Sequence, residues 1–168
     1  MSDFPKRVKL PLLLVLAVLL GGCGFQLRGS SALPHAMSVT YIKGIKPFGT
    51  LADDFTAALR LRNIRVTDRE REATAVLEIT GNNSEKLVVS VDTAGNVLEY
   101  EVRQTIRFSV LTSDHKVIVP EQSVSLGRDY IFSSTDVLGK QREEQDVRAT
   151  LQENLVNLAM LRIAAAAR

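Results

Sequence analysis

The segment Leu98-Glu99-Tyr100-Glu101-Val102-Arg103-Gln104-Thr105-Ile106-Arg107-Phe108-Ser109-Val110-Leu111 decides the fold, because apolar and polar residues alternate along it. Apolar side chains occupy the even positions from 98 to 110 and polar side chains occupy the odd positions, with Gln104 as the exception. Such alternation is typical of an antiparallel strand that has one face in the core and the other in water. We therefore expect a sheet with one apolar face and one polar face.

The next strand is predicted at Val117 to Phe132, after a turn at Thr112 to Lys116. Pro120 falls within this strand, and proline has no N–H to donate to a neighbouring strand. We therefore expect the strand to lie at the edge of the sheet, to carry a bulge, or to be interrupted at Pro120.

The strand before the central segment is predicted to reach it through a hairpin loop at Asp92 to Asn96. Ahead of this loop an apolar strand pattern runs from Ala73 to Thr80 and resumes from Lys86 to Val91. The interval Gly81 to Ser84 can form a turn or a bulge. We favour a bulge in one long strand, because two separate hairpins would need more turn residues than are present.

The N-terminal part of the domain is predicted to contain one more strand and a helix. Met37 to Lys43 is rich in β-branched and aromatic residues, which indicates a strand. Thr50 begins an amphipathic helix that Asn63 ends. Ile64 to Val66 and the charged segment Thr67 to Glu72 are predicted to form a connector.

A long helix is predicted from about Lys140 onward. Its first turns are charged and its later turns are apolar, so we expect a solvated start and a buried end. The order strand-helix-strand-strand-strand-helix predicts an α+β two-layer sandwich, in which two helices pack on one face of a four-stranded mixed sheet. The strands on either side of the first helix are expected to be parallel, and the last three strands to form an antiparallel meander.

The N-terminal residues have the pattern of an export signal. The basic residues Lys6, Arg7 and Lys9 precede an apolar run, Leu10 to Leu20, which is shorter than the roughly 20 residues that span a bilayer. Two glycines and Cys23 follow, and this order is similar to the lipobox of bacterial lipoproteins. The resemblance implies cleavage before Cys23 and attachment of lipid to that residue.

Three parts follow from this pattern: a lipoprotein signal peptide at residues 1–22, a lipid-anchored tether at residues 23–36, and a single α+β domain at residues 37–168. Because two or more acyl chains hold a protein stably at a membrane, we expect the mature protein to be anchored without crossing it. Cys23 could instead be a free thiol or a buried small hydrophobic residue. An internal disulfide is excluded, since Cys23 is the only cysteine.

The charge of the mature chain excludes a general attraction for polyanions. The whole chain has 21 Lys and Arg residues and 19 Asp and Glu residues, and removal of residues 1–22 leaves 18 of each. A neutral domain has no overall field that would steer nucleic acid toward it, so no nucleic-acid partner is expected.

The sequence also lacks the patterns of catalytic and metal sites. His35 and His115 have no other His or Cys at ligand spacing, so we expect both to be exposed polar residues. No G-x-S-x-G elbow, phosphate-binding loop or dinucleotide fingerprint occurs. We therefore predict that the protein is not an enzyme, and that it has no metal and no cofactor apart from the lipid on Cys23.

A basic patch on the polar face is the remaining candidate for a binding site. Arg103 and Arg107 project to the same side of the central segment, roughly 13 Å apart. Lys86 and Arg128 could join them if the neighbouring strands align. Such a patch would suit phosphate groups. The alternative is ordinary cross-strand pairing of the arginines with Glu99 and Glu101.

Four short motifs occur in an order that resembles the LPS-assembly lipoprotein LptE family: Gly22-Cys23-Gly24-Phe25-Gln26-Leu27-Arg28-Gly29, Leu98-Glu99-Tyr100, Arg128-Asp129-Tyr130 and Glu144-Gln145-Asp146. The resemblance covers essentially the whole mature chain. It implies a lipoprotein of the outer membrane that faces the periplasm, plugs the lumen of the LptD β-barrel and helps lipopolysaccharide reach the cell surface. Gly24 fits outer-membrane sorting, because Asp at that place is the familiar signal for retention in the inner membrane.

The chain departs from this family in its hairpin loop. Relatives carry a basic residue there that is implicated in lipopolysaccharide contact, whereas Asp92 to Asn96 contains none. The lipopolysaccharide contact is therefore assigned, as a hypothesis, to Arg103, Arg107, Lys86 and Arg128. The competing function is that of a periplasmic outer-membrane lipoprotein acting as a chaperone or envelope scaffold for another client.

Overall fold

The computed structural model describes residues 33–46, 50–132 and 137–166. The chain divides into two units, Met1–Ser30 and Ser31–Arg168, and all described residues lie in the second. The predicted signal peptide, Cys23 and most of the predicted tether lie outside the described residues, so the lipid anchor and the three-part division remain predictions.

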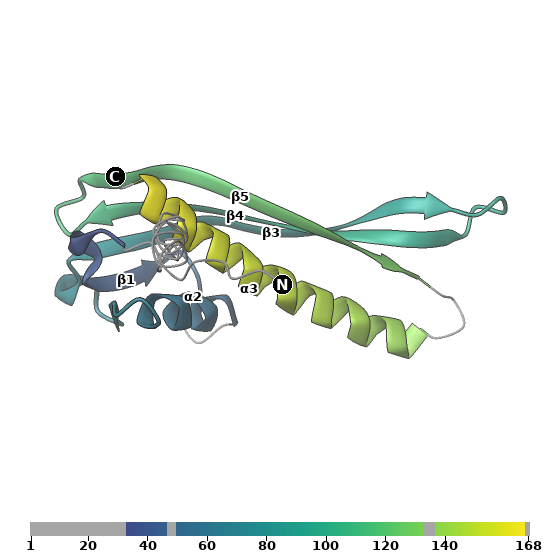
Figure 1. Ribbon diagram of the computed structural model, residues 1–168, viewed down its shortest axis with the longest axis horizontal. Helices are drawn as coiled ribbons and strands as arrows, with labels where there is room; N and C mark the ends of the chain where they lie inside the picture. The colour runs from purple at the N-terminus through teal and green to yellow at the C-terminus, as the bar shows by residue number, and fades with distance from the viewer. Residues whose placement is uncertain (1–32, 47–49, 133–136, 167–168) are drawn as a thin grey trace, which may run out of the picture. The chain divides into compact units, whose positions relative to one another are not determined.

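The described residues form one mixed sheet covered by two helices (Figure 1). The strand order is β2-β1-β3-β4-β5; β1 is parallel to both β2 and β3, and β3, β4 and β5 form an antiparallel meander. The predicted α+β two-layer fold is therefore confirmed. The elements are η1 (His35–Met37), β1 (Val39–Lys43), α2 (Thr50–Arg60), β2 (Arg65–Thr67), η2 (Glu70–Glu72), β3 (Ala75–Val91), β4 (Val97–Thr112), β5 (Val117–Ile131) and α3 (Val137–Ala166).

The sheet has five strands where four were predicted, because part of the expected connector forms β2. Val39 pairs with Arg65 and Tyr41 with Thr67, so β2 extends the sheet beyond β1. The helix α2 thus leads from β1 to β2, and the chain then returns past β1 to begin β3. A strand of 3 residues is too short to show alternation in the sequence.

The end of α2 confirms the predicted role of Asn63. Asn63 has a φ of 61° and follows the last turn of the helix. The N–H of Ile64 donates to the carbonyl oxygen of Leu59 at 3.1 Å, which is the closing bond of a left-handed C-cap. Asparagine tolerates this conformation better than most residues with a side chain.

One long strand, β3, carries the predicted bulge. The register with β4 shifts between Ile79 and Gly81, and again near Ser90, and the strand continues through both irregularities. The shift at Gly81 decides on which face of the sheet the later side chains of β3 lie, because adding one residue to a strand moves every later side chain to the opposite face.

Pro120 lies in an edge strand that also carries a bulge. β5 is the last strand of the sheet, and its register with β4 shifts between the pairs Phe108–Gln122 and Val110–Val119. The missing N–H of Pro120 therefore removes no hydrogen bond between strands in the middle of the sheet.

Two clusters of buried side chains lie between the sheet and the helices. The larger contains Phe55 of α2, Phe108 of β4 and Leu155 of α3. The smaller contains Val102, Tyr130, Val147 and Leu151. From residue 141 the first turns of α3 are mostly exposed, and its later turns bury one face while the other stays exposed, so the predicted buried end is only partly confirmed.

The exception to the alternation, Gln104, lies between these two clusters on the apolar face. Its neighbours at i − 2 and i + 2, Val102 and Ile106, belong to the smaller and the larger cluster respectively. Gln104 is only 6% exposed, and its side-chain amide donates to the Asn82 side chain at 3.3 Å. A buried amide needs such a partner, so the bond to Asn82 makes the polar residue tolerable there.

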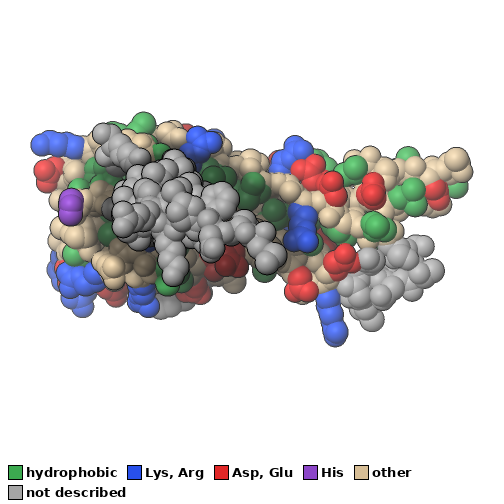
Figure 2. Space-filling model, viewed as in Figure 1, with side chains coloured by type: hydrophobic (Ala, Val, Ile, Leu, Met, Phe, Trp, Pro, Cys, Tyr) green, Lys and Arg blue, Asp and Glu red, His purple; other side chains and the backbone are tan. Residues whose placement is uncertain are grey.

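Beyond the smaller cluster, the β3–β4 hairpin carries exposed apolar side chains (Figure 2). They are Val88, Val89, Val91, Leu98 and, on the adjacent strand, Ile131. The loop at the end of the hairpin is closed by Asp92, whose carboxylate accepts from the N–H groups of Ala94 and Asn96 and from the Asn96 side chain. These bonds confirm the predicted hairpin loop and lower the pKa of Asp92, chiefly through Asn96.

Candidate functional site

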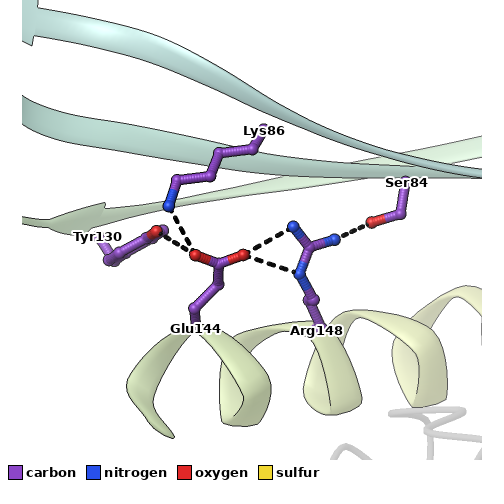
Figure 3. A network of polar contacts seen from close by, with 5 residues as sticks. All are labelled: Ser84, Lys86, Tyr130, Glu144 and Arg148. Carbon is purple, nitrogen blue, oxygen red and sulfur yellow. Dashed lines mark hydrogen bonds and ion pairs between the residues drawn. The ribbon is translucent and has the colours of Figure 1, made fainter. Parts of the chain in front are cut away.

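A cluster of polar side chains joins the start of α3 to the sheet (Figure 3). Lys86 and Ser84 come from β3, Tyr130 from β5, and Glu144 and Arg148 from α3. Because these elements are far apart in sequence, the cluster exists only when the helix lies on the sheet. We call these five residues the Glu144 cluster.

Glu144 is the acceptor at the centre of the cluster. Its Oε2 atom accepts from the Lys86 ammonium and from the Tyr130 hydroxyl, each at 2.7 Å. Its Oε1 atom accepts from the Arg148 Nε and from a terminal nitrogen of the same guanidinium, at 3.1 and 2.7 Å. The other terminal nitrogen of Arg148 donates to the Ser84 hydroxyl. One carboxylate thus holds two cations and a phenol.

The pKa values follow from this geometry. Burial by itself raises the pKa of Glu144, but the bonds from Lys86, Tyr130 and Arg148 outweigh it and lower the pKa from 4.5 to about 2. Burial likewise lowers the pKa of Lys86, but the interactions with Glu144 and Tyr130 together outweigh it, so the net shift of the pKa is upward. Both groups are therefore charged at neutral pH, and each keeps the other charged.

Three aromatic rings also lie close to the Lys86 ammonium. Its nitrogen lies 4.0 Å from the centre of the Tyr100 ring, and 5.4 and 5.9 Å from the centres of Tyr130 and Phe132. Tyr100 stacks on Tyr130 with ring centres 6.0 Å apart and meets Phe132 edge-on at 5.4 Å. Such cation–π contacts stabilise the ammonium in this position.

An open pocket of about 480 Å³ borders the cluster. Its walls contain two cations, Lys86 and Arg148, and one anion, Glu144. Tyr130, Phe132, Gln141 and Gln145 complete the lining. The pocket therefore combines an excess of positive charge with aromatic rings and side-chain amides.

The four basic residues predicted to form one patch lie on two faces of the sheet. Lys86, Val102 and Arg128 are directly paired across β3, β4 and β5, and paired residues point to the same face. Val102 is fully buried under α3, so Lys86 and Arg128 are on the helix-covered side. The expected joining of all four residues is therefore wrong, because the residues paired with Arg103 on the neighbouring strands are Glu85 and Gly127 rather than Lys86 and Arg128.

Arg103 and Arg107 lie together on the open face, as their spacing predicted. Arg103 makes two hydrogen bonds to the Glu101 carboxylate, both at 2.9 Å, so its partner is one of the two glutamates that the alternative named, but on the same strand rather than across strands. The carboxylate lies over Gly127, where a Cβ would come within 2.0 Å of it. Arg107 lies over Gly81 in the same way, and within the described residues its guanidinium makes no hydrogen bond or ion pair.

The remaining candidates are the two histidines, possible metal sites and possible membrane-spanning helices. His35 and His115 are both exposed, as predicted. Among the described residues, no group of three or more His, Cys, Asp or Glu side chains is arranged to hold a metal ion. None of the helices in this part of the chain is long and apolar enough to cross a membrane.

The sequence-based site prediction included Lys86 and missed Tyr130, Glu144 and Arg148. The sequence did contain a signal for Tyr130 and Glu144. Each of three motifs, Leu98-Glu99-Tyr100, Arg128-Asp129-Tyr130 and Glu144-Gln145-Asp146, places one side chain at the cluster. Tyr100, Tyr130 and Glu144 meet around Lys86. Arg148 had no such signal, because an Arg four residues after a Glu on a helix is common at any solvated face.

Comparison with known proteins identifies relatives over nearly the whole domain. Residues 36–163 match the family model LptE, described as lipopolysaccharide-assembly. The chain is 32% identical over 146 residues to the LPS-assembly lipoprotein LptE of Yersinia pestis strain Pestoides F, which covers 86% of this chain and 70% of that protein. The corresponding protein of Yersinia pseudotuberculosis strain YPIII matches to the same extent.

Solved structures share the fold. Lipoprotein B from Nitrosomonas europaea superimposes with a TM-score of 0.70 at 23% identity, over 84% of this chain and 91% of that one. The rare lipoprotein B from Shewanella oneidensis gives a TM-score of 0.64 at 21% identity, over 76% and 94%. These likenesses extend the sheet and helix arrangement described above to other bacterial lipoproteins.

Proposed function

Because the chain belongs to the LptE family of lipopolysaccharide-assembly lipoproteins, we propose that it is the plug of an outer-membrane β-barrel, LptD, through which lipopolysaccharide reaches the cell surface. The observation that carries this proposal is the family match across residues 36–163, which includes every strand and nearly all of α3. The protein acts in lipopolysaccharide transport and assembly, and the barrel partner is the proposed part.

The open face of the sheet supports a position inside a barrel. It carries side chains that a water-lined lumen accommodates, with charges locally balanced, as in the Glu101–Arg103 pair. Two glycines, Gly81 and Gly127, let long side chains lie flat across the strands. The mature chain is formally neutral, so no strong field opposes entry into the lumen.

We assign the protein to the periplasmic side of the outer membrane, held by lipid on Cys23. The basic, apolar and Gly-Gly-Cys order at the N-terminus supports the lipid, and Gly24 supports outer-membrane sorting. The chain works as a non-catalytic assembly subunit with no cofactor beyond this lipid. The alternative of a chaperone or scaffold for another client is not favoured, because the family is one of lipopolysaccharide assembly.

Lipopolysaccharide contacts are proposed on both faces of the sheet. Lys86 and Arg128 are available on the helix-covered side and Arg103 and Arg107 on the open side. Guanidinium and ammonium groups suit the anionic groups of lipopolysaccharide.

Isolation of the tagged full-length protein from detergent-extracted envelopes tests the proposal. We expect a large β-barrel to copurify in a stable one-to-one complex. A matched preparation from cells that express an unrelated tagged outer-membrane lipoprotein serves as the control. Recovery of the protein without any barrel would contradict the plug function and favour another client.

A further inference from the structure

One end of the sheet brings together η1, the junction between α2 and β2, and the turn between β4 and β5. The N–H of Arg65, at the start of β2, donates to the carbonyl oxygen of Ser38 at 3.0 Å. The N–H of Ser113 in the turn donates to the carbonyl oxygen of Thr74 at 3.1 Å, and the Thr74 hydroxyl donates to the carbonyl oxygen of Ala36 at 2.6 Å. The last turns of α3, yellow in Figure 1, lie at this end too. We call residues 33–38, 60–65, 113–117 and 161–166 the η1 end.

Three exposed apolar side chains lie at the η1 end, each beside a basic residue. They are Leu61, Val117 and Leu161, which are 82%, 63% and 52% exposed. Their basic neighbours in the sequence are Arg60 and Arg62 for Leu61, Lys116 for Val117, and Arg162 for Leu161. A single exposed apolar side chain is ordinary. An apolar side chain beside a cation is suited to a lipid surface, because the first can enter the interface while the second stays at the level of the phosphates.

The η1 end also carries an unbalanced positive charge. Its basic residues are Arg60, Arg62, Arg65, Lys116 and Arg162, and its one acidic residue is Asp114. Figure 2 shows basic side chains, in blue, at this end on the left. Since the mature chain has 18 residues of each sign, the rest of it holds 13 basic and 17 acidic residues. The domain is neutral as a whole but positive at one end, and such a charge distribution orients a protein on an anionic surface.

The positive charge is not neutralised by nearby carboxylates. None of these five basic residues forms an ion pair with another described residue. Asp53 and Asp68 line a pocket together with Arg60 and Arg65, yet form no ion pair with them. The arginines are therefore available to anions outside the domain.

The exposed apolar side chains of the β3–β4 hairpin have different neighbours. Asp92 follows Val91 and Glu99 follows Leu98, and no Lys or Arg is adjacent in sequence to any exposed apolar residue there. Apolar exposure therefore occurs at both ends of the sheet, but only at the η1 end is it combined with positive charge. An anionic lipid surface would attract the η1 end and repel the acidic residues of the hairpin.

The predicted lipid anchor leads into the domain at the η1 end. Leu33 and Pro34 begin the described chain, and the N–H of Met37 in η1 donates to the carbonyl oxygen of Pro34 at 2.9 Å. Leu33 comes ten residues after Cys23, and ten residues span at most about 35 Å. Lipid on Cys23 would therefore keep the η1 end within that distance of a bilayer.

We propose that the η1 end is a second membrane contact, which lies on a surface of anionic phospholipid. Leu61, Val117 and Leu161 enter the interface, and the neighbouring basic side chains bind the phosphates. The contact takes the lipid anchor from the proposed function and belongs to the anchored protein before it enters a barrel. The anchor limits the distance between the domain and the bilayer, and the η1 end determines which part of the domain faces it.

Fluorescence quenching in vesicles tests the contact. The full mature protein is reconstituted without a barrel into vesicles of phosphatidylcholine and phosphatidylglycerol in equal parts and, separately, of phosphatidylcholine alone. Leu61→Cys carries a fluorescent probe on its new thiol, since lipid occupies the sulfur of Cys23 and the chain has no other cysteine. Val91→Cys, at the hairpin end and 53% exposed in the wild type, is the matched control. A spin-labelled phospholipid quenches the probe where it meets the bilayer.

The proposal requires quenching that depends on position and on charge. In the anionic vesicles we expect quenching about threefold stronger at position 61 than at position 91. The difference should disappear in phosphatidylcholine alone and in high salt, which screens the attraction. Equal quenching at the two positions in the anionic vesicles would overturn the proposal. Equally strong quenching at position 61 in phosphatidylcholine alone would overturn it as well.

Two arginine variants show whether the charge of the η1 end is responsible. Arg60→Gln, combined with Leu61→Cys, should reduce the quenching at position 61 about twofold. Arg142→Gln, near the start of α3, removes the same charge elsewhere and should leave the quenching unchanged. Both arginines are exposed, so neither variant should alter the thermal unfolding temperature. An equal loss of quenching in the two variants would overturn the assignment to the η1 end.

The copurification that tests the proposed function is independent of these vesicles. Recovery of the barrel from envelopes, with no quenching difference between positions 61 and 91, would overturn this inference alone. Absence of the barrel, with the quenching difference present, would overturn the plug function alone.

Discussion

The ammonium nitrogen of Lys86 lies 2.7 Å from the carboxylate of Glu144, and this ion pair joins positions 58 residues apart in the chain. Lys86 belongs to β3 and Glu144 to α3, so the pair fixes the start of the last helix against the sheet. The smaller core cluster has only four buried residues, and the polar contacts of Glu144 supplement it.

The first prediction concerns the pH dependence of stability. The pKa of Glu144 in the folded protein is about 2, below its ordinary 4.5, so its contribution is complete above about pH 4.5 and is lost as the pH falls toward 2. We expect Glu144→Gln to lower the free energy of unfolding by about 2 kcal/mol at pH 7, with the difference from wild type shrinking across that window. Urea unfolding at a series of pH values measures it, with the exposed Glu153→Gln as control. A constant difference from pH 7 to pH 2 would contradict the assignment.

The second prediction isolates the phenol of Tyr130. Tyr130→Phe keeps the ring that stacks on Tyr100 and removes the hydroxyl that donates to Glu144 at 2.7 Å. We expect a loss of about 1 kcal/mol in the free energy of unfolding and a rise in the pKa of Glu144, observed by carboxyl NMR titration. Tyr41→Phe is the control, because no hydrogen bond of the Tyr41 hydroxyl occurs within the described residues, and its stability should stay unchanged. An unshifted Glu144 titration in Tyr130→Phe would show that the hydroxyl is irrelevant.

The third prediction compares two glycines with nearly the same positive φ. Gly44 has a φ of 89° and Gly95 a φ of 87°. A Cβ on Gly44 would lie 2.1 Å from the backbone oxygen of Ile79, whereas a Cβ on Gly95 would meet nothing within 4 Å. We expect Gly95→Ala to cost about 1 kcal/mol from backbone strain alone and Gly44→Ala to cost about 3 kcal/mol or more. Thermal and urea unfolding measure both, and equal costs would show that β1 does not approach β3 so closely.

The fourth prediction ranks the two arginines of the open face. Arg103 is held by Glu101, while Arg107 has no such partner within the described residues, so Arg107→Ala should weaken binding to purified lipopolysaccharide more than Arg103→Ala. We expect about threefold or more for Arg107→Ala. Arg71→Ala, in η2, is the control. Wild-type affinity in the double variant Arg103→Ala, Arg107→Ala would remove the open face from the binding surface.

The fifth prediction concerns the anchor. Cys23→Ala removes the predicted site of lipid attachment, and the domain should then leave the membrane fraction after a carbonate or high-salt wash. Fractionation followed by immunoblotting measures it. A variant that stays in the membrane fraction after the wash would show that another segment holds the protein there.

Local patterns predicted most of the fold. The alternation in β4, the hairpin loop at Asp92–Asn96 and the stop at Asn63 all depend on residues that are close in sequence. The short β2 was missed, because its 3 residues are stabilised by pairing with β1 rather than by any pattern of their own. Pairing of that kind is a tertiary effect.

The candidate site was less predictable for a related reason. Parity within β4 placed Arg103 and Arg107 on one face correctly. The side of the sheet on which Lys86 lies depends on whether the bulge near Gly81 adds a residue to β3, because a shift of one residue moves the side chain to the other side. Glu144 and Arg148 come from a helix that was expected to pack on the sheet, but its sequence pattern does not show which strand residues its first turns would meet.

The last helix has a consequence for the chain before folding is complete. Until α3 docks on the sheet, the residues that cover it, such as Leu155 and Met160, are not in place. During that interval the apolar row of β4 and the edge of β5 are both uncovered, which is the condition under which partly folded chains associate. The time before α3 docks is therefore when this protein most needs to be kept apart from other copies.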